Sequence, residues 1–257
     1  MSFINNNNGT SGRFANQFFR NTVAHFISEK WDLDFKYSMS DAMSRLGLIF
    51  YKGTCKFPIN QTYNITNRNF MKFINGNGNC NGDSGTDLAP GNINLSGDYF
   101  QTVEYAHYLR EYINRMDVKS KIIAANPYRV RYKDSTSTVF VHVRLGDARQ
   151  FAPSFQYFDS ILADCQFDEG WISSDSINDP ICKQLIQKYG LKVWSGDEVD
   201  TIQFASTCKT LILSNGTFSW LMGLLAFRDD SVIHYPKIKK IWHGDIFVFP
   251  DWICNKW

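Results

Sequence analysis

The segment His142-Val143-Arg144-Leu145-Gly146-Asp147 combines side chains that could bind an anion with a glycine that could turn the chain. It continues the apolar run Val139–Val141, which predicts a buried strand. Charged groups at the carboxyl end of a parallel strand lie where such folds bind ligands. The planar fork of Arg144 could hold two phosphate oxygens, and His142 would share its face of the strand. A structural ion pair between Arg144 and Asp147 explains the same residues equally well.

A second polar cluster, Ser214-Asn215-Gly216-Thr217-Phe218-Ser219, follows the apolar run Leu211–Leu213 and precedes a predicted helix. Backbone N–H groups and hydroxyls at a helix N-terminus can bind an anion. Combined with Arg144 from an earlier strand of the same sheet, this cluster would form a diphosphate clamp. The alternative is an ordinary helix start, capped by Ser214 or Thr217.

A third cluster, the turn Gly12-Arg13-Phe14-Ala15-Asn16-Gln17, offers backbone donors and the amides of Asn16 and Gln17 at the start of another helix. It would face the same crevice only if two lobes close on each other. Composition alone favours a simple capped turn.

Several sequence motifs that hold phosphates, metals or nucleophiles do not occur in the chain: G-x-G-x-x-G, G-x-x-x-x-G-K-[ST], G-x-S-x-G and H-E-x-x-H. Asp32 and Asp34 form an Asp-x-Asp pair, but within a predicted strand. We therefore expect neither a metal nor a cofactor. Arg144 and helix dipoles would have to neutralise a diphosphate.

Composition narrows the classes of partner and site. The formal charge of +2 disfavours nucleic-acid binding by the whole protein. The six cysteines include no C-x-x-C pair, so free thiols are expected rather than a zinc site. No apolar stretch approaches the length of a membrane span, and the first residues do not resemble a signal peptide. These observations predict a chain without a membrane span, in the cytoplasm of a cell or of a host.

From Thr138 onward, short apolar runs alternate with stretches of helical period, which predicts an α/β fold with a parallel sheet flanked by helices. Asp179 and the residues 195–197 supply helix caps. The predicted strands are 138–144, 171–173, 192–194, 211–214 and 232–234, and the predicted helices are 155–164, 180–189, 199–207 and 218–227.

The first half is less regular. Apolar residues recur at helical spacing from Ala15 to Ile27 and again over 102–116, and 32–37 reads as a strand. The Gly- and Asn-rich residues 75–97 read as a loop, and polar residues at 125–137 mark a boundary between two domains.

Six short stretches resemble motifs of the α-1,2-fucosyltransferases and their bacterial and viral relatives, and they occur in the same order along the chain. These proteins are inverting enzymes that use GDP-fucose. The central one, His142–Asp147, is similar to that family's His-x-Arg-Arg-x-Asp motif. The others are Gly12–Phe19, Ser96–Tyr105, Trp171–Asp175, Leu213–Trp220 and Pro250–Trp252.

The resemblance implies a GT-B-like fold of two Rossmann-like lobes, with residues 1–130 on the acceptor side and 131–257 binding the nucleotide sugar. Its substrates would be GDP-fucose and a glycan acceptor, and no metal would be needed. Catalysis would fall to Arg144, His142 and Asp147. The implied donor-binding residues are Asn16, Gln17, Arg144, Asp175, Ser214, Asn215, Thr217, Phe218 and Ser219, and the implied acceptor-binding residues are Asp98, Tyr99 and Gln101.

The chain departs from the family at three positions. Leu145 stands where the family has a second Arg, Gly216 replaces a Ser, and Leu221 replaces the second Trp of a pair. These departures leave open a different nucleotide sugar, or a catalytically silent module that binds a glycan or nucleotide. A glycoside hydrolase, which needs two suitably spaced carboxylates, is a further alternative but gives no reason for Arg144.

Overall fold

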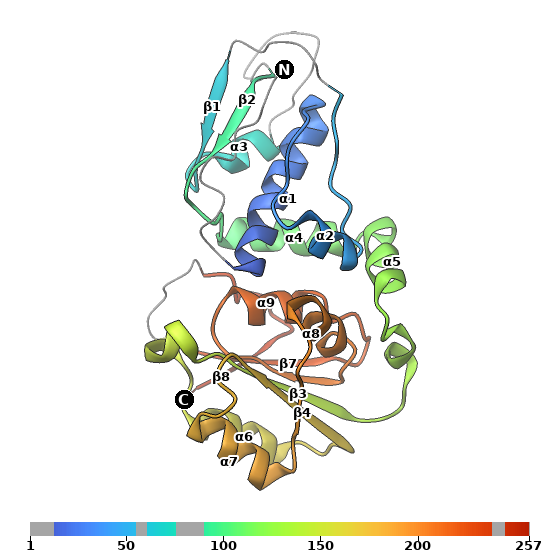
Figure 1. Ribbon diagram of the computed structural model, residues 1–257, viewed down its shortest axis with the longest axis vertical. Coiled ribbons are helices and arrows are strands. Elements are labelled where there is room, and N and C mark those ends of the chain that lie inside the picture. Colours follow the sequence, from blue (N-terminus) through green and yellow to red (C-terminus); the bar gives the residue numbers. More distant parts are fainter. Residues whose placement is uncertain (1–12, 55–60, 76–89, 238–244, 257) are drawn as a thin grey trace. The chain divides into compact units, whose positions relative to one another are not determined.

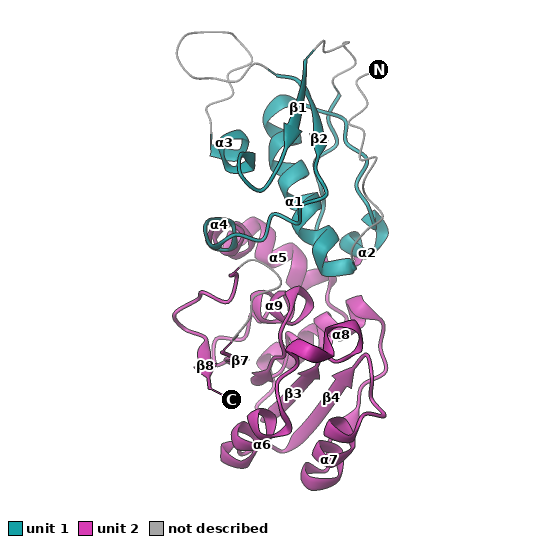
Figure 2. Cartoon of the chain, turned by 90° about the vertical axis from the view of Figure 1, so that its left-hand side faces the viewer, with its two compact units in different colours: residues 1–44, 48–106 teal, residues 45–47, 107–257 magenta. Residues whose placement is uncertain are grey.

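The computed structural model describes residues 13–54, 61–75, 90–237 and 245–256. Backbone contacts divide the chain into two compact units, which Figure 2 distinguishes by colour. Unit 1 comprises residues 1–44 and 48–106, and unit 2 comprises 45–47 and 107–257. This division lies earlier in the chain than the polar segment 125–137, which belongs to unit 2.

Unit 2 is built on a six-stranded sheet in which every neighbouring pair is parallel, in the order β5-β4-β3-β6-β7-β8. Counted along the chain from β3, this is the order 3-2-1-4-5-6 of doubly wound, Rossmann-type sheets. The sequence-based prediction of a parallel sheet is therefore confirmed. The strands are β3 (Thr138–Val143), β4 (Glu169–Ser174), β5 (Lys192–Val193), β6 (Thr210–Ile212), β7 (Val232–Pro236) and β8 (Ile253–Asn255).

Helices cover both faces of this sheet, as Figure 1 shows. On one face lie α6 (Phe155–Asp164) and α7 (Pro180–Tyr189); on the other lie α8 (Glu198–Ala205) and α9 (Thr217–Leu224). All six residues of β3 are buried, as expected for a central strand covered on both sides. The predicted caps also occur, because the carboxylates of Asp179 and Asp197 accept backbone N–H groups at the starts of α7 and α8.

The remaining elements of unit 2 precede or interrupt the sheet. The helix expected over 102–116 is α4 (Val103–Asn114), which begins in unit 1, and a break at Arg115 separates it from α5 (Met116–Ala125). Two 3-10 helices follow, η1 (Arg129–Lys133) and η2 (Gly146–Phe151). The second of these continues directly from the His142–Asp147 segment.

Unit 1 packs around α1 (Phe14–Trp31), the helix predicted from the apolar spacing. Nearly every side chain of α1 is buried, including the polar Arg20, Asn21 and His25. Two short parallel strands pair beside it, Ile65 opposite Leu95 at their ends. Its other elements are α2 (Ser40–Arg45), whose last residue is counted with unit 2, β1 (Thr62–Ile65), α3 (Phe70–Asn75) and β2 (Asn92–Leu95).

Two predictions for the first half were wrong. The segment 32–37 is not a strand: Leu33, Phe35 and Tyr37 are buried and Asp34 and Lys36 exposed in alternation, yet the segment belongs to neither sheet. An alternating pattern of apolar and polar residues predicts an extended segment, but it does not show whether another strand pairs with that segment. The predicted loop 75–97 contains β2, and its residues 76–89 lie outside the described part. The described residues of unit 1 therefore form a two-stranded sheet rather than a Rossmann-like one.

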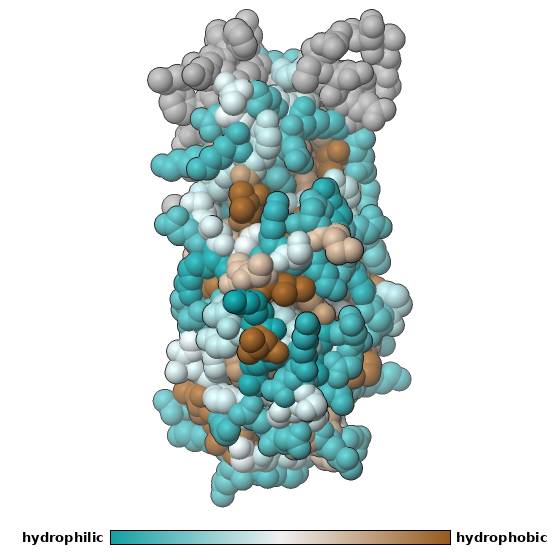
Figure 3. Space-filling model, turned by 90° about the vertical axis from the view of Figure 1, so that its right-hand side faces the viewer, coloured by the Kyte–Doolittle hydropathy of each residue, from teal (hydrophilic) through white to brown (hydrophobic). Residues whose placement is uncertain are grey.

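Three further features concern the surface and the side chains: whether a helix could span a membrane, where hydrophobic areas are exposed, and the state of the cysteines. Among the described helices, none combines the length and apolar character needed to cross a membrane. On the face drawn in Figure 3, hydrophobic side chains form small areas separated by hydrophilic ones. Four cysteines are free thiols, Cys165, Cys182, Cys208 and Cys254, whereas Cys55 and Cys80 lie outside the described residues.

Candidate functional site

The candidate site lies where the strand order of the unit 2 sheet reverses. β3 and β6 are neighbours, with Val141 opposite Ile212, and the chain proceeds outward from them in opposite directions. In open α/β sheets, ligands bind outside the carboxyl ends of the strands at such a point. The residues that follow β3 begin with Arg144, and those that follow β6 lead through Ser214 into α9. The fold thus brings together two polar clusters that are about 70 residues apart in the sequence.

His142 is a buried, neutral member of this site. Its side chain is 4% exposed, and its Nδ1 lies 2.6 Å from the hydroxyl oxygen of Ser219 on α9. The ring also packs against Phe218, with 5.3 Å between ring centroids. Burial, assisted by the nearby charge of Arg144, lowers the pKa of His142 to about 3. His142 therefore links β3 to α9 as an uncharged hydrogen-bonding group at neutral pH.

Arg144 is held between two carboxylates. Its guanidinium forms ion pairs with Asp147, three residues later, and with Asp175, which follows β4. The side chain of Arg144 is 12% exposed, that of Asp175 is 26% and that of Asp147 is 65%. The structure therefore contains the Arg144–Asp147 ion pair that was one of the two interpretations of the sequence. It adds the non-local partner Asp175, whose contact with Arg144 the sequence did not indicate.

Asp175 is fixed by the backbone that follows β3. Its Oδ1 accepts a hydrogen bond of 3.0 Å from the N–H of Leu145. Gly146 has a φ of +20°, and a Cβ added there would lie 2.6 Å from the other carboxylate oxygen. A side chain at position 146 would therefore collide with Asp175, so the glycine permits the close approach of backbone and carboxylate.

Leu145 points into the core instead of the site. It is 1% exposed and belongs to the apolar cluster that includes Val143, Tyr157 and Phe158. Side chains alternate along a strand and its extension, so the residue after Arg144 is directed to the opposite face. The position at which the resembling family has a second Arg is thus an apolar packing position in this chain.

The turn between β6 and α9 contains buried polar atoms that the protein does not use. In the described part of the chain, Ser214 Oγ and Asn215 Oδ1 are both buried and have no hydrogen-bond partner. The turn itself is well anchored, because the Tyr157 hydroxyl donates to the carbonyl of Leu213 over 2.8 Å and the Asn215 amide donates to the carbonyl of Phe151. Buried polar atoms are rarely left unpaired, so these two are suited to a ligand.

The first turn of α9 completes this arrangement. Gly216 precedes it with a φ of +104° and, as a glycine, has no side chain that could cap the helix. Thr217 is 6% exposed and Ser219 is fully buried. Uncapped N–H groups at a helix N-terminus provide donors and a partial positive charge. Ser214, one of the two caps that the sequence offered, does not cap α9, because its Oγ has no hydrogen-bond partner in the described part of the chain.

The predicted site residues of unit 1 form a separate polar cluster. The Gln101 amide donates to Asn16 Oδ1 over 2.8 Å, and Gln17 is 2% exposed on the same turn of α1. Asp98 and Tyr99 are both partly buried, and the Asp98 carboxylate accepts the N–H of Asn67 over 2.8 Å. Gly12, the first residue of this motif, lies outside the described residues.

Arg20 organises this cluster, although the sequence did not single it out. It is 1% exposed and donates to the carbonyls of Ser96 and Asp98 over 2.5 and 2.7 Å. Burial lowers its pKa, while neighbouring Tyr99 and Asp98 oppose that shift. Phe100, inside the same segment, has a φ of +59°, an unusual conformation for a bulky residue. The sequence signal that could have identified Arg20 was a charged residue among the apolar residues of α1.

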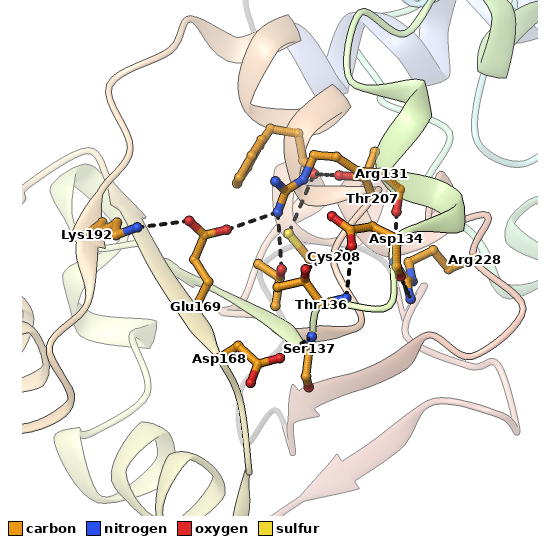
Figure 4. A network of polar contacts seen from close by, with 12 residues as sticks. Arg131, Asp134, Thr136, Ser137, Asp168, Glu169, Lys192, Thr207, Cys208 and Arg228 are labelled. Carbon is orange, nitrogen blue, oxygen red and sulfur yellow. Dashed lines mark hydrogen bonds and ion pairs between the residues drawn. The ribbon is translucent and has the colours of Figure 1, made fainter.

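A further polar network closes the opposite, amino-terminal edge of the unit 2 sheet (Figure 4). Arg131 of η1 donates to Thr138 at the start of β3 and pairs with Glu169 at the start of β4. Lys192 also pairs with Glu169, at 2.9 Å. Burial raises the pKa of the adjacent Cys208 thiol to about 12, so this cysteine is protonated at neutral pH. These contacts tie strand starts together and are structural.

No metal-binding arrangement is found within the described ranges, where no group of three or more His, Cys, Asp or Glu side chains could hold an ion. Comparison with known proteins identifies no family, because no family model matches the chain and no curated protein or solved structure is significantly similar to it.

Proposed function

We propose that the protein is an inverting glycosyltransferase that transfers a sugar, L-fucose from GDP-fucose, to a hydroxyl of a glycan acceptor. The observation that carries the proposal is the arrangement at the switch point. Arg144 follows β3, and the unpaired buried atoms Ser214 Oγ and Asn215 Oδ1 follow β6, beside the start of α9. This is a combination of charge, polar atoms and helix dipole that suits a nucleotide diphosphate.

In this proposal the acceptor hydroxyl attacks the anomeric carbon while the bond from that carbon to the diphosphate oxygen breaks. The diphosphate leaves with the bonding electrons, and the proton of the hydroxyl passes to a water molecule and from there to the solvent. Arg144 and the N-terminus of α9 stabilise the growing negative charge, which is why the reaction would need no metal. His142 is neutral and bonded to Ser219, so it serves to orient α9 instead of transferring a proton.

The two carboxylates that pair with Arg144, those of Asp147 and Asp175, differ in how easily a donor could displace them. Asp175 is held by the Leu145 N–H and the Gly146 turn, whereas Asp147 is largely exposed. A diphosphate that binds Arg144 takes the place of the Asp147 carboxylate, and Asp175 continues to orient the guanidinium. The proposal extends to a GT-B-like arrangement in which Asn16, Gln17, Asp98, Tyr99 and Gln101 serve the donor and acceptor from unit 1.

The test compares two arginines of the same segment. We expect Arg144→Ala to abolish release of GDP from GDP-fucose and to weaken donor binding in calorimetry, with the fold retained by circular dichroism. Arg149→Ala is the matched control, since Arg149 lies in η2, is 61% exposed and pairs with Asp179 at the surface. Full turnover by the Arg144 variant, with or without a chelator, contradicts the assignment.

A catalytically silent binding module is the second candidate, and one observation favours it. Arg144 faces two carboxylates with no second Arg beside it, so the local charge of these three groups is negative. A panel of GDP-, UDP- and dTDP-sugars separates the candidates. Binding without release of nucleotide, in the presence of a mixture of glycan acceptors, identifies the silent module; release from one donor identifies the enzyme and its sugar.

A further inference from the structure

A pocket of about 220 Å³ lies within unit 2 at the end of α9 that is remote from the candidate site. Its lining includes Gly223 and Leu224, the last residues of α9, whereas Ser214 and Thr217 precede or begin that helix. Eight residues of helix span about 12 Å, so the pocket and the candidate site are separate places on one element. The volume is below the range of about 300–1,000 Å³ typical of drug-sized ligands, which limits an occupant to one small ring or a similar molecule.

The walls of the pocket are rigid. Arg110 of α4 forms a forked ion pair with Asp251, at 2.5 and 2.6 Å, and its guanidinium lies 4.5 Å from the centre of the Phe249 ring. A Cβ added at Gly223 would lie 2.6 Å from the Trp252 ring, so α9 and this ring are in close contact. Phe249 and Trp252, two of the aromatic residues that line the pocket, are almost fully buried.

The charges around the pocket balance. Arg110 is committed to Asp251, and Arg228 is committed to Asp230. Of the other lining charges, Lys119 lies 5.2 Å from the Phe227 ring and Asp229 is exposed, and neither makes an ion pair within the described residues. The carboxyl end of α9 adds a partial negative charge, which disfavours an anion. A neutral ligand therefore fits better than a phosphate or a carboxylate.

The pocket also offers hydrogen-bonding groups of both kinds. Ser231 Oγ lines it, is buried and has no hydrogen-bond partner in the described part of the chain. Asn114 also lines the pocket, and its side-chain nitrogen donates to the carbonyl of Arg110 over 2.9 Å. Donors, acceptors and aromatic residues in one small, neutral pocket match a molecule that carries several hydroxyls.

We propose that this pocket binds a neutral monosaccharide unit, as a second carbohydrate site remote from Arg144. The site does not depend on the proposed transferase activity, because it uses none of the residues assigned to the donor or the acceptor. Ser231 and Asn114 bond ring hydroxyls, and the Arg110–Asp251 fork closes one wall.

The test uses methyl glycosides of galactose, glucose, mannose, fucose and N-acetylglucosamine, observed by saturation-transfer NMR on the full chain. We expect at least one glycoside to bind the wild type. Asn114→Trp, which adds a large ring to the lining, should weaken binding at least tenfold. Glu111→Trp is the matched control: Glu111 is exposed on the same helix and does not line the pocket, so binding should stay within twofold. Ser231→Ala should weaken binding about fivefold, the effect of one hydrogen bond.

Three outcomes overturn the proposal. No glycoside binds the wild type, or the Asn114→Trp variant binds glycosides as well as the wild type does. In the third, the wild type binds inorganic phosphate more tightly than any glycoside, and Asn114→Trp abolishes that phosphate binding. Arg144→Ala distinguishes this site from the proposed active site. Retention of glycoside binding in that variant supports the pocket, and its loss places the glycoside at the active site instead. Donor binding, measured on the same samples, reports independently on the proposed function.

Discussion

The hydrogen bond of 2.6 Å between His142 Nδ1 and Ser219 Oγ joins the end of strand β3 to the first turn of helix α9. Both residues are buried, and the bond crosses the point where the strand order reverses. Together with the packing of the His142 ring against Phe218, this bond fixes the end of β3 relative to the start of α9. Arg144 follows the first of these segments, and the Ser214 turn precedes the second.

Removing one partner of this bond should cost stability. Ser219→Ala leaves a buried imidazole nitrogen without its partner, a loss of about 1–3 kcal/mol in the free energy of unfolding. Urea denaturation measures the change. Ser160→Ala is a suitable comparison, since Ser160 is partly exposed on α6 and bonds only within its own helix. An equal, small effect of both substitutions would show that the His142–Ser219 bond contributes nothing special.

The buried His142 should also make stability depend on pH. Its pKa is about 3 in the folded chain against an ordinary value of 6.5, so between these values the unfolded chain binds one proton more. The free energy of unfolding therefore falls as the pH drops from about 6.5 towards 3, by up to about 1.4 kcal/mol per pH unit. His142→Gln, which does not titrate, should show a shallower slope across this window. Identical slopes would argue against a neutral, buried His142.

The two carboxylates on Arg144 should differ in importance for the fold. Asp147→Asn should change the free energy of unfolding by less than about 0.5 kcal/mol, because Asp147 is 65% exposed. Asp175→Ala should cost about 1–3 kcal/mol, since it leaves the Leu145 N–H without its acceptor and removes the less exposed of the two carboxylates that pair with Arg144. Thermal and urea unfolding of the two variants measure this contrast, and a reversed order would contradict the account of Asp175 as the fixed partner.

Substitutions of three glycines by alanine separate two causes of lost stability, an unfavourable backbone conformation and a steric contact of the added Cβ. Gly97→Ala should be nearly neutral, because no atom lies within 4 Å of the added Cβ. Gly190→Ala, at a φ of +65° with open space around it, should cost about 1 kcal/mol from conformation alone. Gly146→Ala should cost more than Gly190→Ala, because its Cβ also meets Asp175 at 2.6 Å. Equal costs at 146 and 190 would show that Asp175 moves away freely.

Local signals in the sequence located most elements of the second half of the chain. Helices α6 and α7 occupy the predicted residues 155–164 and 180–189, and the ends of α7 are marked by Asp179, Pro180 and Gly190. The central strands were recognisable as apolar runs, since a strand covered on both faces needs no polar residues. Strand β8 was missed, because Ile253–Asn255 is short and its pairing with β7 is not visible locally.

Non-local pairing explains the errors in the first half and at the site. β1 and β2 are Asn-containing tetrapeptides about 30 residues apart, and only their mutual pairing distinguishes them from loop. The Arg144–Asp175 pair likewise joins residues that follow two different strands of the sheet, β3 and β4. The sequence placed Arg144 at a strand end, whereas the identity of its fixed partner depended on the order of strands.

The inward direction of Leu145 has a consequence for how this sequence can change over time. An arginine introduced at position 145 would have to place its guanidinium in the apolar cluster with Val143, Tyr157 and Phe158. Any increase in positive charge beside Arg144 would have to come from another position or from loss of Asp147. The packing of Leu145 thus keeps Arg144 the only arginine at this point of the segment, whatever Arg144 binds.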